Sequence, residues 1–321
     1  MSPRGPDSVR AGLVAAAARP LAQFAANLPR TVGDRAYDAI HDTRVALRRL
    51  GALLRAFAPV LSPRTVAGIK REIRWLRRQL GPARDLDVFL HETGPALSAL
   101  FRAEPGLAIM LDVARRRRAP LGATLAKTIA SRRCARFQAA LQKLFGPDGA
   151  PPRPSGRRRA AGVPTLDSPF SPFAYAELRR RYKKLRKSAN RVAKLREDEL
   201  HRLRIRLRNF RYVCDGFRML LPEHRYAALR SAMTKMQDHM GALNDAVNAP
   251  HLAAELVAKA GRGHDRAGRD RAGRDRAALA RAAGAAAGWG AARRQVMRST
   301  LDEPWRRMVK RADRMFAALK K

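Results

Sequence analysis

The feature that most limits the fold is an internal repeat at a constant offset of 160 residues. The segment HDTRVALRRL begins at His41 and HRLRIRLRNF begins at His201, so both read H-x-x-R-x-x-L-R. Further pairs keep this register: Leu47 with Leu207, Phe57 with Phe217, Leu61 with Leu221, Gly81 with Gly241 and Asp85 with Asp245. A register kept this far indicates duplicated helical units. We therefore predict two similar bundles related by a pseudo-twofold axis.

Helical periodicity dominates the chain, whereas alternating β-branched patterns are scarce, so the predicted class is all-α. We expect a first half at 1–150, a linker at 151–172 and a second half at 173–321. The linker lies inside the Pro-, Gly- and Ser-rich stretch 146–173. The repetitive segment RGHDRAGRDRAGRDRAA at 262–278 predicts a mobile loop.

The charge balance predicts a polyanionic partner. There are 67 Lys and Arg against 27 Asp and Glu, which gives a net charge of +40. The excess divides almost evenly between the two halves, so it belongs to no terminal tail. Salt bridges within the fold cannot balance it, and a polyanion is the physical expectation.

Arginine is far commoner than lysine, at 55 to 12. Guanidinium is planar, permanently charged and able to donate two parallel hydrogen bonds, which suits phosphate. A GC-rich genome would also favour arginine over lysine, but it does not explain the deficit of acidic residues.

The compartment prediction rests on three features. Cys134 and Cys214 are the two cysteines and neither is in a C-x-x-C motif, which indicates a reducing compartment without a disulfide framework. The Ala-rich N-terminus continues as an amphipathic pattern, so we expect a first helix and no signal peptide. No run approaches the roughly 20 apolar residues of a membrane span. We expect a cytoplasmic protein with no membrane association and leave the oligomeric state open.

Each H-x-x-R segment predicts a helix with one cationic face. At about 100° per residue, Arg44, Arg48 and Arg55 fall within about 60° of His41 on one side. In the second segment, His201, Arg204, Arg208 and Arg211 together span about 80°, with Tyr212 near the edge. Apolar residues fill the opposite faces: Leu47, Leu50, Leu54, Phe57 and Leu61 in the first helix, and Leu203, Leu207, Phe210, Cys214 and Phe217 in the second.

Neighbouring helices extend the candidate anion site. The next helix of the first half has a basic face opposite the stripe of Ile69, Ile73 and Leu76. Its counterpart in the second half carries Arg230, Thr234 and Gln237, so we expect a lopsided site. The complete candidate set is His41, Arg44, Arg48, Arg49, Arg55, Lys70, Arg74, Arg77, Arg132, Arg133, Arg136, His201, Arg204, Arg208, Arg211 and Tyr212. Whether Arg115 to Arg118 join it stays open.

Charged helix faces usually do no more than face water. An ordinary solvated face, however, mixes charges to gain pairs worth about 0.2 to 0.5 kcal/mol each. The stretch from His41 to Arg55 has one acid, Asp42. The two histidines could donate to phosphate, hold Asp85 or Asp245, or be satisfied locally. Metal ligation would need further partners in reach, and no H-x-x-x-H motif is present. We expect neither metal nor cofactor.

These motifs resemble the CHAD family, the conserved histidine α-helical domain. The matching residues are His41, Arg44, Arg48 and Arg49 with the LGPARD segment at 80–85, and His201, Arg204, Arg208 and Arg211 with GALND at 241–245. The resemblance implies two four-helix bundles about a pseudo-twofold axis. It also implies a basic central cavity or groove that binds inorganic polyphosphate, and association with polyphosphate granules in the cytoplasm.

Two departures from the family pattern predict a weaker surface. Gly51 stands where relatives often have another basic residue, and Asn209 replaces the second arginine of its pair. The E-x-E-x-K signature of the triphosphate-tunnel domain that precedes CHAD in many relatives is missing. We therefore expect no hydrolase site and no enzymatic activity.

Two alternative functions remain. A nucleic-acid-binding protein would use the same charge, but the 19 aromatic residues fall mostly on apolar stripes. A metal-dependent phosphohydrolase, or an accessory to one, would need clustered carboxylates. Asp85 and Asp87 form the one close acidic pair in a basic context, and we expect these acids to brace basic side chains.

Overall fold

Helices make up the computed structural model, which describes residues 5–33, 36–149, 162–188, 192–260 and 269–319. The all-α class is confirmed: within these ranges the only extended pairing is an isolated bridge between Ser8 and Pro169. The chain divides into two compact units, each drawn from both sequence halves. Unit 1 comprises residues 1–80, 126–237 and 302–321, and unit 2 comprises 81–125 and 238–301. These units do not coincide with the halves at 1–150 and 173–321, which stay a prediction.

Unit 1 contains the longer amphipathic helices. They are α1 (Val9–Asn27), α2 (Ala36–Ala56), α3 (Pro63–Gln79), α8 (Arg132–Phe145), α9 (Phe170–Arg186), α10 (Glu197–Gly216) and α13 (Asp302–Ala318). Short 3-10 turns lie at Pro29–Thr31, Ala58–Val60, Val192–Lys194 and Arg218–Leu220. Helix α11 (Glu223–Ala260) begins in unit 1 and ends in unit 2, and α7 (Leu121–Ile129) likewise has residues in both.

Serine side chains fix several helix starts in unit 1. Ser8 accepts a hydrogen bond from the backbone N–H of Ala11 at 3.2 Å, and Ser62 accepts one from Thr65 at 3.1 Å. Ser131 does the same for Cys134 at 3.2 Å. Each bond satisfies one of the four N–H groups that a helix start leaves without an intrahelical acceptor. The predicted first helix is thereby confirmed as α1.

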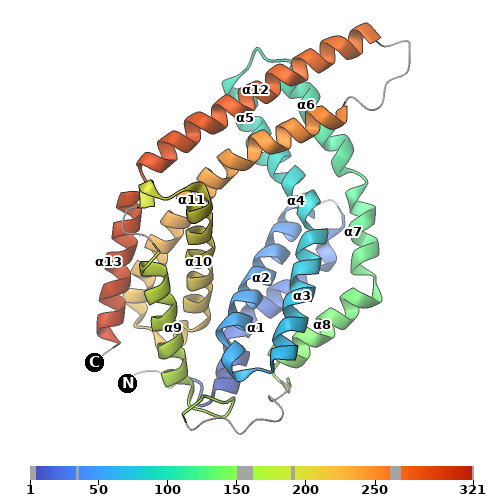
Figure 1. Cartoon of the computed structure of the whole chain (residues 1–321). Coiled ribbons are helices and arrows are strands. Elements are labelled where there is room, and N and C mark those ends of the chain that lie inside the picture. The colour runs from blue at the N-terminus through green and yellow to red at the C-terminus, as the bar shows by residue number, and fades with distance from the viewer. Residues whose placement is uncertain (1–4, 34–35, 150–161, 189–191, 261–268, 320–321) are drawn as a thin grey trace. The chain divides into compact units, whose positions relative to one another are not determined.

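Helix α2 packs against α1, α3 and α10, and α9 packs against α10 (Figure 1). Both predicted apolar stripes are buried, from Leu47 to Leu61 and from Leu203 to Phe217. The repeat-related Phe57 and Phe217 meet edge to face, with ring centroids 5.6 Å apart, and Phe170 stacks beside Phe57. Burying each such ring contributes about 1.5 to 3 kcal/mol. The same core therefore holds α2 against α10.

One glycine permits a close approach in this core. A Cβ added to Gly12 of α1 would lie 2.2 Å from the Phe170 ring. Any other residue would force the ring away. The backbone next to Phe170 also pairs with the start of α1, since Val9 N–H donates to the Ser168 carbonyl at 2.9 Å. Residues 151–161 of the predicted linker lie outside the described ranges, and α9 begins at Phe170, just inside the expected end of the linker.

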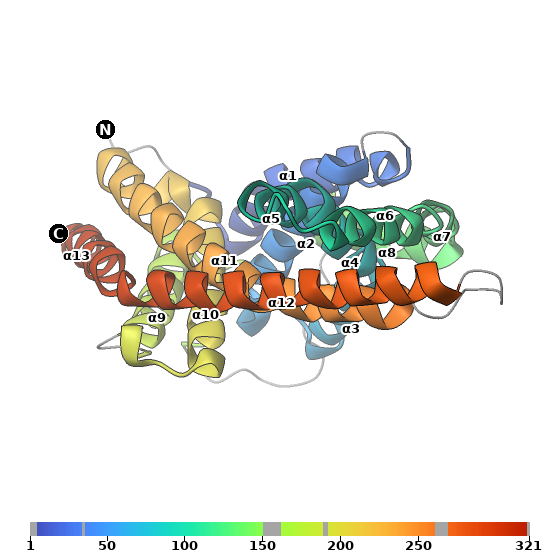
Figure 2. The same ribbon diagram turned by 90° about the horizontal axis from the view of Figure 1, so that it is seen from above.

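Unit 2 consists of shorter helices and one long one. They are α4 (Gly81–Val88), a π-helical turn at Phe89–Thr93, α5 (Gly94–Leu100), α6 (Gly106–Arg118) and α12 (Arg269–Ser299). Helix α12 packs along α6 and α5 (Figure 2). Their core contains Leu97, Leu107 and Met110 with Leu256 and Leu279.

The mobile loop predicted at 262–278 is wrong from Arg269 onward, because α12 begins there. Alanine and arginine are strong helix formers, and one interior glycine costs only about 1 kcal/mol. The repetitive composition was therefore helix-compatible. Residues 261–268 lie outside the described ranges.

Candidate anion-binding site

The packing of α2 on α10 brings the two predicted cationic faces together within unit 1. Arg55 of α2 donates from Nη2 to Asn209 Oδ1 of α10 at 2.8 Å. The basic face of α3 lies next to α2. Arg44 Nη1 of α2 donates to the backbone carbonyl of Arg77 of α3 at 2.8 Å. We call the resulting group the arginine array. Its members are Arg48, Arg49, Arg55, Arg77, Arg208 and Arg211.

The arginine array is held by neutral acceptors. Arg49 Nη1 donates to Gln23 Oε1 at 2.8 Å, and Arg211 Nη1 donates to Thr234 Oγ1 at 3.1 Å. Within the described residues, no member of the array forms an ion pair with a carboxylate. The carboxylates of the described residues therefore leave the positive charge of these side chains uncompensated.

Five guanidinium groups of the array keep unused donors. The Nε atoms of Arg48, Arg49, Arg77, Arg208 and Arg211 are buried and make no hydrogen bond to the described protein. A buried donor left without a partner costs about 1 to 3 kcal/mol. These unpaired donors therefore add to the free-energy cost of holding the array together.

The array is also electrostatically unfavourable. Burial, together with repulsion from Arg48, Arg204 and Arg77, lowers the pKa of Arg208 to about 10. Burial and repulsion from Arg48 likewise lower the pKa of Arg77. Arginine stays protonated at neutral pH in any case. The shifts therefore show that the folded protein holds these cations together at a cost in free energy.

Arg55 lies at the solvent-facing edge of the array. Surrounding protein, followed by repulsion from Arg181 and Arg77, lowers its pKa to about 10. Asn209 was predicted to weaken the cationic surface. In the structure its amide oxygen accepts the hydrogen bond from Arg55. An arginine at that position would place a further cation against Arg55. Gly51 is buried and lies beneath this surface, near Ile73 and Arg55.

The ring of Tyr212 contacts two arginines of the array. The residue is 4 % exposed, and the guanidinium carbons of Arg49 and Arg211 lie 5.7 and 5.5 Å from its ring centroid. Cation–π contacts of this kind contribute about 0.5 to 2 kcal/mol. The prediction that Tyr212 itself contacts the ligand needs correction, because burial makes it a platform for two arginines.

Helix α9 contributes a cation that the sequence reasoning missed. Arg181 is half-buried and lies close enough to Arg55 to lower its pKa. Its own carboxylate partner, Glu177, is 5 % exposed and also pairs with Arg180 at 2.7 Å. The available signal was a glutamate on the apolar stripe of α9, four residues before an arginine. A buried carboxylate requires such a partner.

The remaining predicted residues occupy several positions. His41 and His201 are exposed on α2 and α10, and Arg44 and Arg204 are half-buried on the same helices. Lys70 and Arg74 are exposed on α3, on the flank that carries Arg77. The contacts predicted between the two histidines and Asp85 or Asp245 stay a prediction.

The three predicted residues of α8 are not brought into the array. Arg133 pairs with Glu72 of α3, with Nε and Oε2 2.7 Å apart, and its guanidinium lies 4.3 Å from the Trp75 ring centroid. Arg136 is on the same side of α8, and Arg132 is exposed nearby. Glu72 and Trp75 lie on the flank of α3 opposite Arg77, since the helix turns about 100° per residue.

In unit 2, three of the four arginines at 115–118 pair with carboxylates. Arg118 donates from Nε to Asp87 Oδ1 at 2.6 Å, and Asp87 is 3 % exposed. Arg117 pairs with Glu255 at 3.1 Å and Arg116 with Asp112 at 2.8 Å. The expectation that Asp87 braces a basic side chain is confirmed.

The described residues contain neither a candidate metal centre nor a candidate membrane span. No group of three or more His, Cys, Asp or Glu side chains there could hold a metal ion. Nor does that part of the chain contain a helix of the length and hydropathy needed to cross a bilayer.

Comparison with known proteins identifies related folds. A family model described as CHAD domain matches residues 15–254. A crystal structure of the CHAD domain from the plant Ricinus communis superposes with a TM-score of 0.75 at 22% identity, covering 96% of this chain and 94% of that one. PptA from Streptomyces chartreusis matches with a TM-score of 0.58 at 17% identity, covering 94% of this chain and 100% of that one. No curated protein sequence matches the chain.

Proposed function

Because the chain belongs to the CHAD domain family, we propose that it binds inorganic polyphosphate through the arginine array. The observation that carries this proposal is the meeting of Arg48, Arg77 and Arg208 from three helices, where no carboxylate of the described residues pairs with them. Polyphosphate supplies what these groups lack, namely closely spaced negative charge and many acceptor oxygens.

The proposed binding surface combines both halves of the repeat. Helices α2 and α10 present one H-x-x-R face each, as expected for two helical bundles about a pseudo-twofold axis with a basic groove between them. Arginines one turn apart are about 5.4 Å apart along a helix and can engage successive or alternate phosphates. A flexible phosphate chain can follow both faces.

Affinity in this mechanism depends on chain length. One exposed ion pair contributes only about 0 to 1 kcal/mol, so a single phosphate binds weakly. A long chain makes many contacts and releases counterions, which gives tight and salt-sensitive binding, as with other polyanions. We further propose that this binding places the protein at polyphosphate granules and that it involves no turnover of the polymer.

Nucleic acid carries a similar charge but also offers bases. Binding single strands usually relies on exposed aromatic rings that stack on bases. Among the described residues, the exposed large hydrophobic side chains are Val32, Leu100, Val163 and Val296, none of them aromatic. This favours a ligand without bases.

Titration with polyphosphates of graded length tests the proposal. We expect affinity per chain to rise steeply from orthophosphate through short oligomers to long chains at near-physiological salt. Duplex DNA and RNA, added as competitors at equal phosphate concentration, should displace long polyphosphate poorly. Equal molar affinity for orthophosphate and long polyphosphate would overturn the proposal, as would preferential binding of nucleic acid. A phosphate-release assay with Mg²⁺ tests the absence of turnover.

A further inference from the structure

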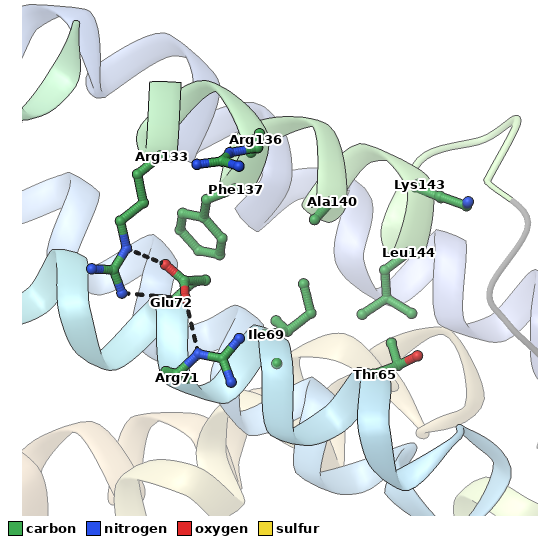
Figure 3. Close-up of a pocket in the computed structure, with 11 residues that line it drawn as sticks. Thr65, Ile69, Arg71, Glu72, Arg133, Arg136, Phe137, Ala140, Lys143 and Leu144 are labelled. Atoms are coloured by element: carbon green, nitrogen blue, oxygen red, sulfur yellow. Dashed lines mark hydrogen bonds and ion pairs between the residues drawn. The ribbon is translucent and has the colours of Figure 1, made fainter. Parts of the chain in front are cut away.

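A pocket lies in unit 1 between α3 and α8, on residues that do not belong to the arginine array. Its volume is about 500 Å³, and we call it the α3–α8 pocket. Figure 3 shows Arg71 and Arg133 on either side of Glu72 at one end, with Thr65 and Leu144 towards the other. Small-molecule sites typically have volumes of about 300 to 1,000 Å³.

The middle of the α3–α8 pocket is apolar and open. Ile69, Phe137 and Leu144 form its floor, and each is less than 10 % exposed. Gly68 and Ala140 also line it. A Cβ added to Gly68 would meet nothing within 4 Å, so close packing does not require this glycine. The space above the floor can therefore hold an apolar group.

At one end of the pocket, Glu72 lies between two arginines. Glu72 accepts from Arg133 Nε at 2.7 Å and from Arg71 Nε at 3.2 Å. The hydrogen bond from Arg133 is the main reason that the pKa of Glu72 lies below its ordinary value. The Arg133 guanidinium also lies over the Trp75 ring. Both arginines therefore share one carboxylate.

The α8 wall carries charge that is not satisfied in this way. Arg136 and Lys143 line the pocket, and within the described residues neither forms an ion pair with a carboxylate. They are seven residues apart, so they lie on one face of α8 about 10 Å apart along its axis. The pocket thus combines an apolar floor with a cationic rim.

We propose that the α3–α8 pocket binds a small amphiphilic anion, a molecule with an apolar body and one carboxylate, sulfonate or phosphate group. The apolar body would lie over Ile69, Phe137 and Leu144, and the acidic group would pair with Arg136 or Lys143. The apolar floor offers no hydrogen-bond donors, which disfavours a ligand that is charged along its whole length. The site is therefore distinct in chemistry from the arginine array.

The probe for this site is 8-anilinonaphthalene-1-sulfonate, an aromatic sulfonate whose fluorescence rises in apolar surroundings. The full-length protein is first saturated with long polyphosphate, which occupies the array. We expect the probe still to bind, with a clear rise in emission. Absence of binding under this condition would overturn the proposal.

Two variants locate the probe. Gly68→Leu fills the open middle of the pocket and should weaken probe binding at least tenfold. The matched control is Gly284→Leu, an exposed position of α12 where an added Cβ also meets nothing within 4 Å, and it should bind as wild type. The second variant, Arg136→Glu with Lys143→Glu, changes two exposed side chains and so keeps the fold. It should also weaken the probe at least tenfold, and wild-type affinity in this double variant would refute the site.

Competing ligands test the chemical class. Dodecanoate and dodecyl phosphate should displace the probe. Orthophosphate, which has no apolar body, should not displace it, and dodecyltrimethylammonium, which has the same tail with a cationic head, should do so much more weakly. Equal displacement by orthophosphate would reduce the site to a simple anion site. Equal displacement by the cation would reduce it to an apolar patch, and either result contradicts the proposal.

Discussion

The arginine array and the arginine run of α6 contain the same residue type in opposite surroundings. Three of the four arginines at 115–118 pair with carboxylates, and Asp87 is buried to receive Arg118. In the array, Arg48, Arg77 and Arg208 repel one another, and neutral groups accept the hydrogen bonds of their neighbours. Composition alone does not separate these two groups.

The difference indicates which arginines stabilise the fold and which are available to a ligand. A paired arginine contributes through its partner, so removing either member leaves a charge uncompensated. A repelling arginine lowers the stability of the empty protein and is relieved by an anion. The arginines therefore divide into some that stabilise the fold through a carboxylate partner and some whose charge the described residues leave uncompensated.

The largest effect should come from breaking the buried pair of unit 2. Asp87→Ala leaves Arg118, whose side chain is 17% exposed, without its carboxylate. We expect a loss of about 3 to 5 kcal/mol in the free energy of unfolding, measured by urea denaturation. Asp112→Ala is the matched control, because its pair with Arg116 is exposed and should change stability by less than about 1 kcal/mol. Similar losses in both variants would remove the distinction between the two pairs.

Charge reversal in the array should be the next largest effect, and it acts on binding. Arg48→Glu with Arg208→Glu should weaken long-chain polyphosphate binding about 100-fold, or about 2.8 kcal/mol. Arg115→Glu with Arg116→Glu makes the same change in net charge on α6 and should weaken binding by less than tenfold. Titration of both double variants at one salt concentration measures this. Equal losses would mean that net charge matters and the array does not.

Much of this arrangement could be predicted from the sequence, and the reasons for success and failure are physical. Helical periodicity fixes which side of its own helix a residue occupies, so the buried stripes through Leu47 and Leu207 were predicted correctly. Periodicity does not say which neighbour that side will meet. For this reason Arg133 was predicted to be part of the anion site, although it forms an ion pair with Glu72 on the other flank of α3.

The sequence also did not predict which groups accept hydrogen bonds from the arginines. Arg55 meets Asn209 across 154 positions, and Arg44 meets the backbone of Arg77. Such contacts depend on how α2, α3 and α10 pack, and helix propensity contains no information about them. Tyr212 was placed at the edge of the cationic face, yet tertiary packing buries it beneath Arg49 and Arg211.

A smaller effect with the opposite sign should follow when a repelling arginine is removed. Arg208→Met keeps much of the side-chain packing and removes one buried cation, so we expect the empty protein to gain about 1 kcal/mol in the free energy of unfolding. A polyphosphate concentration about 100 times the dissociation constant should stabilise the wild type by about 2.7 kcal/mol and the variant by less. Urea denaturation with and without polyphosphate measures both quantities. A destabilised empty variant would contradict the view that the array is strained.

The smallest predicted effect concerns the carboxylate shared by Arg71 and Arg133. The pKa of Glu72 is lowered in the folded protein, chiefly by the hydrogen bond from Arg133, so its ionised form stabilises the fold above the ordinary glutamate pKa. That contribution is lost as pH falls through the lowered value. Glu72→Gln should therefore cost up to about 1 kcal/mol at neutral pH and less near pH 3. Urea denaturation at the two pH values measures the difference. Glu303→Gln removes an exposed partner of Arg307 and should have little effect at either pH. If the cost of Glu72→Gln stayed the same in acid, the cost would come from packing and not from charge. The ion pairs of Glu72 with Arg71 and Arg133 would then differ both from the buried ion pair of unit 2 and from the arginine array.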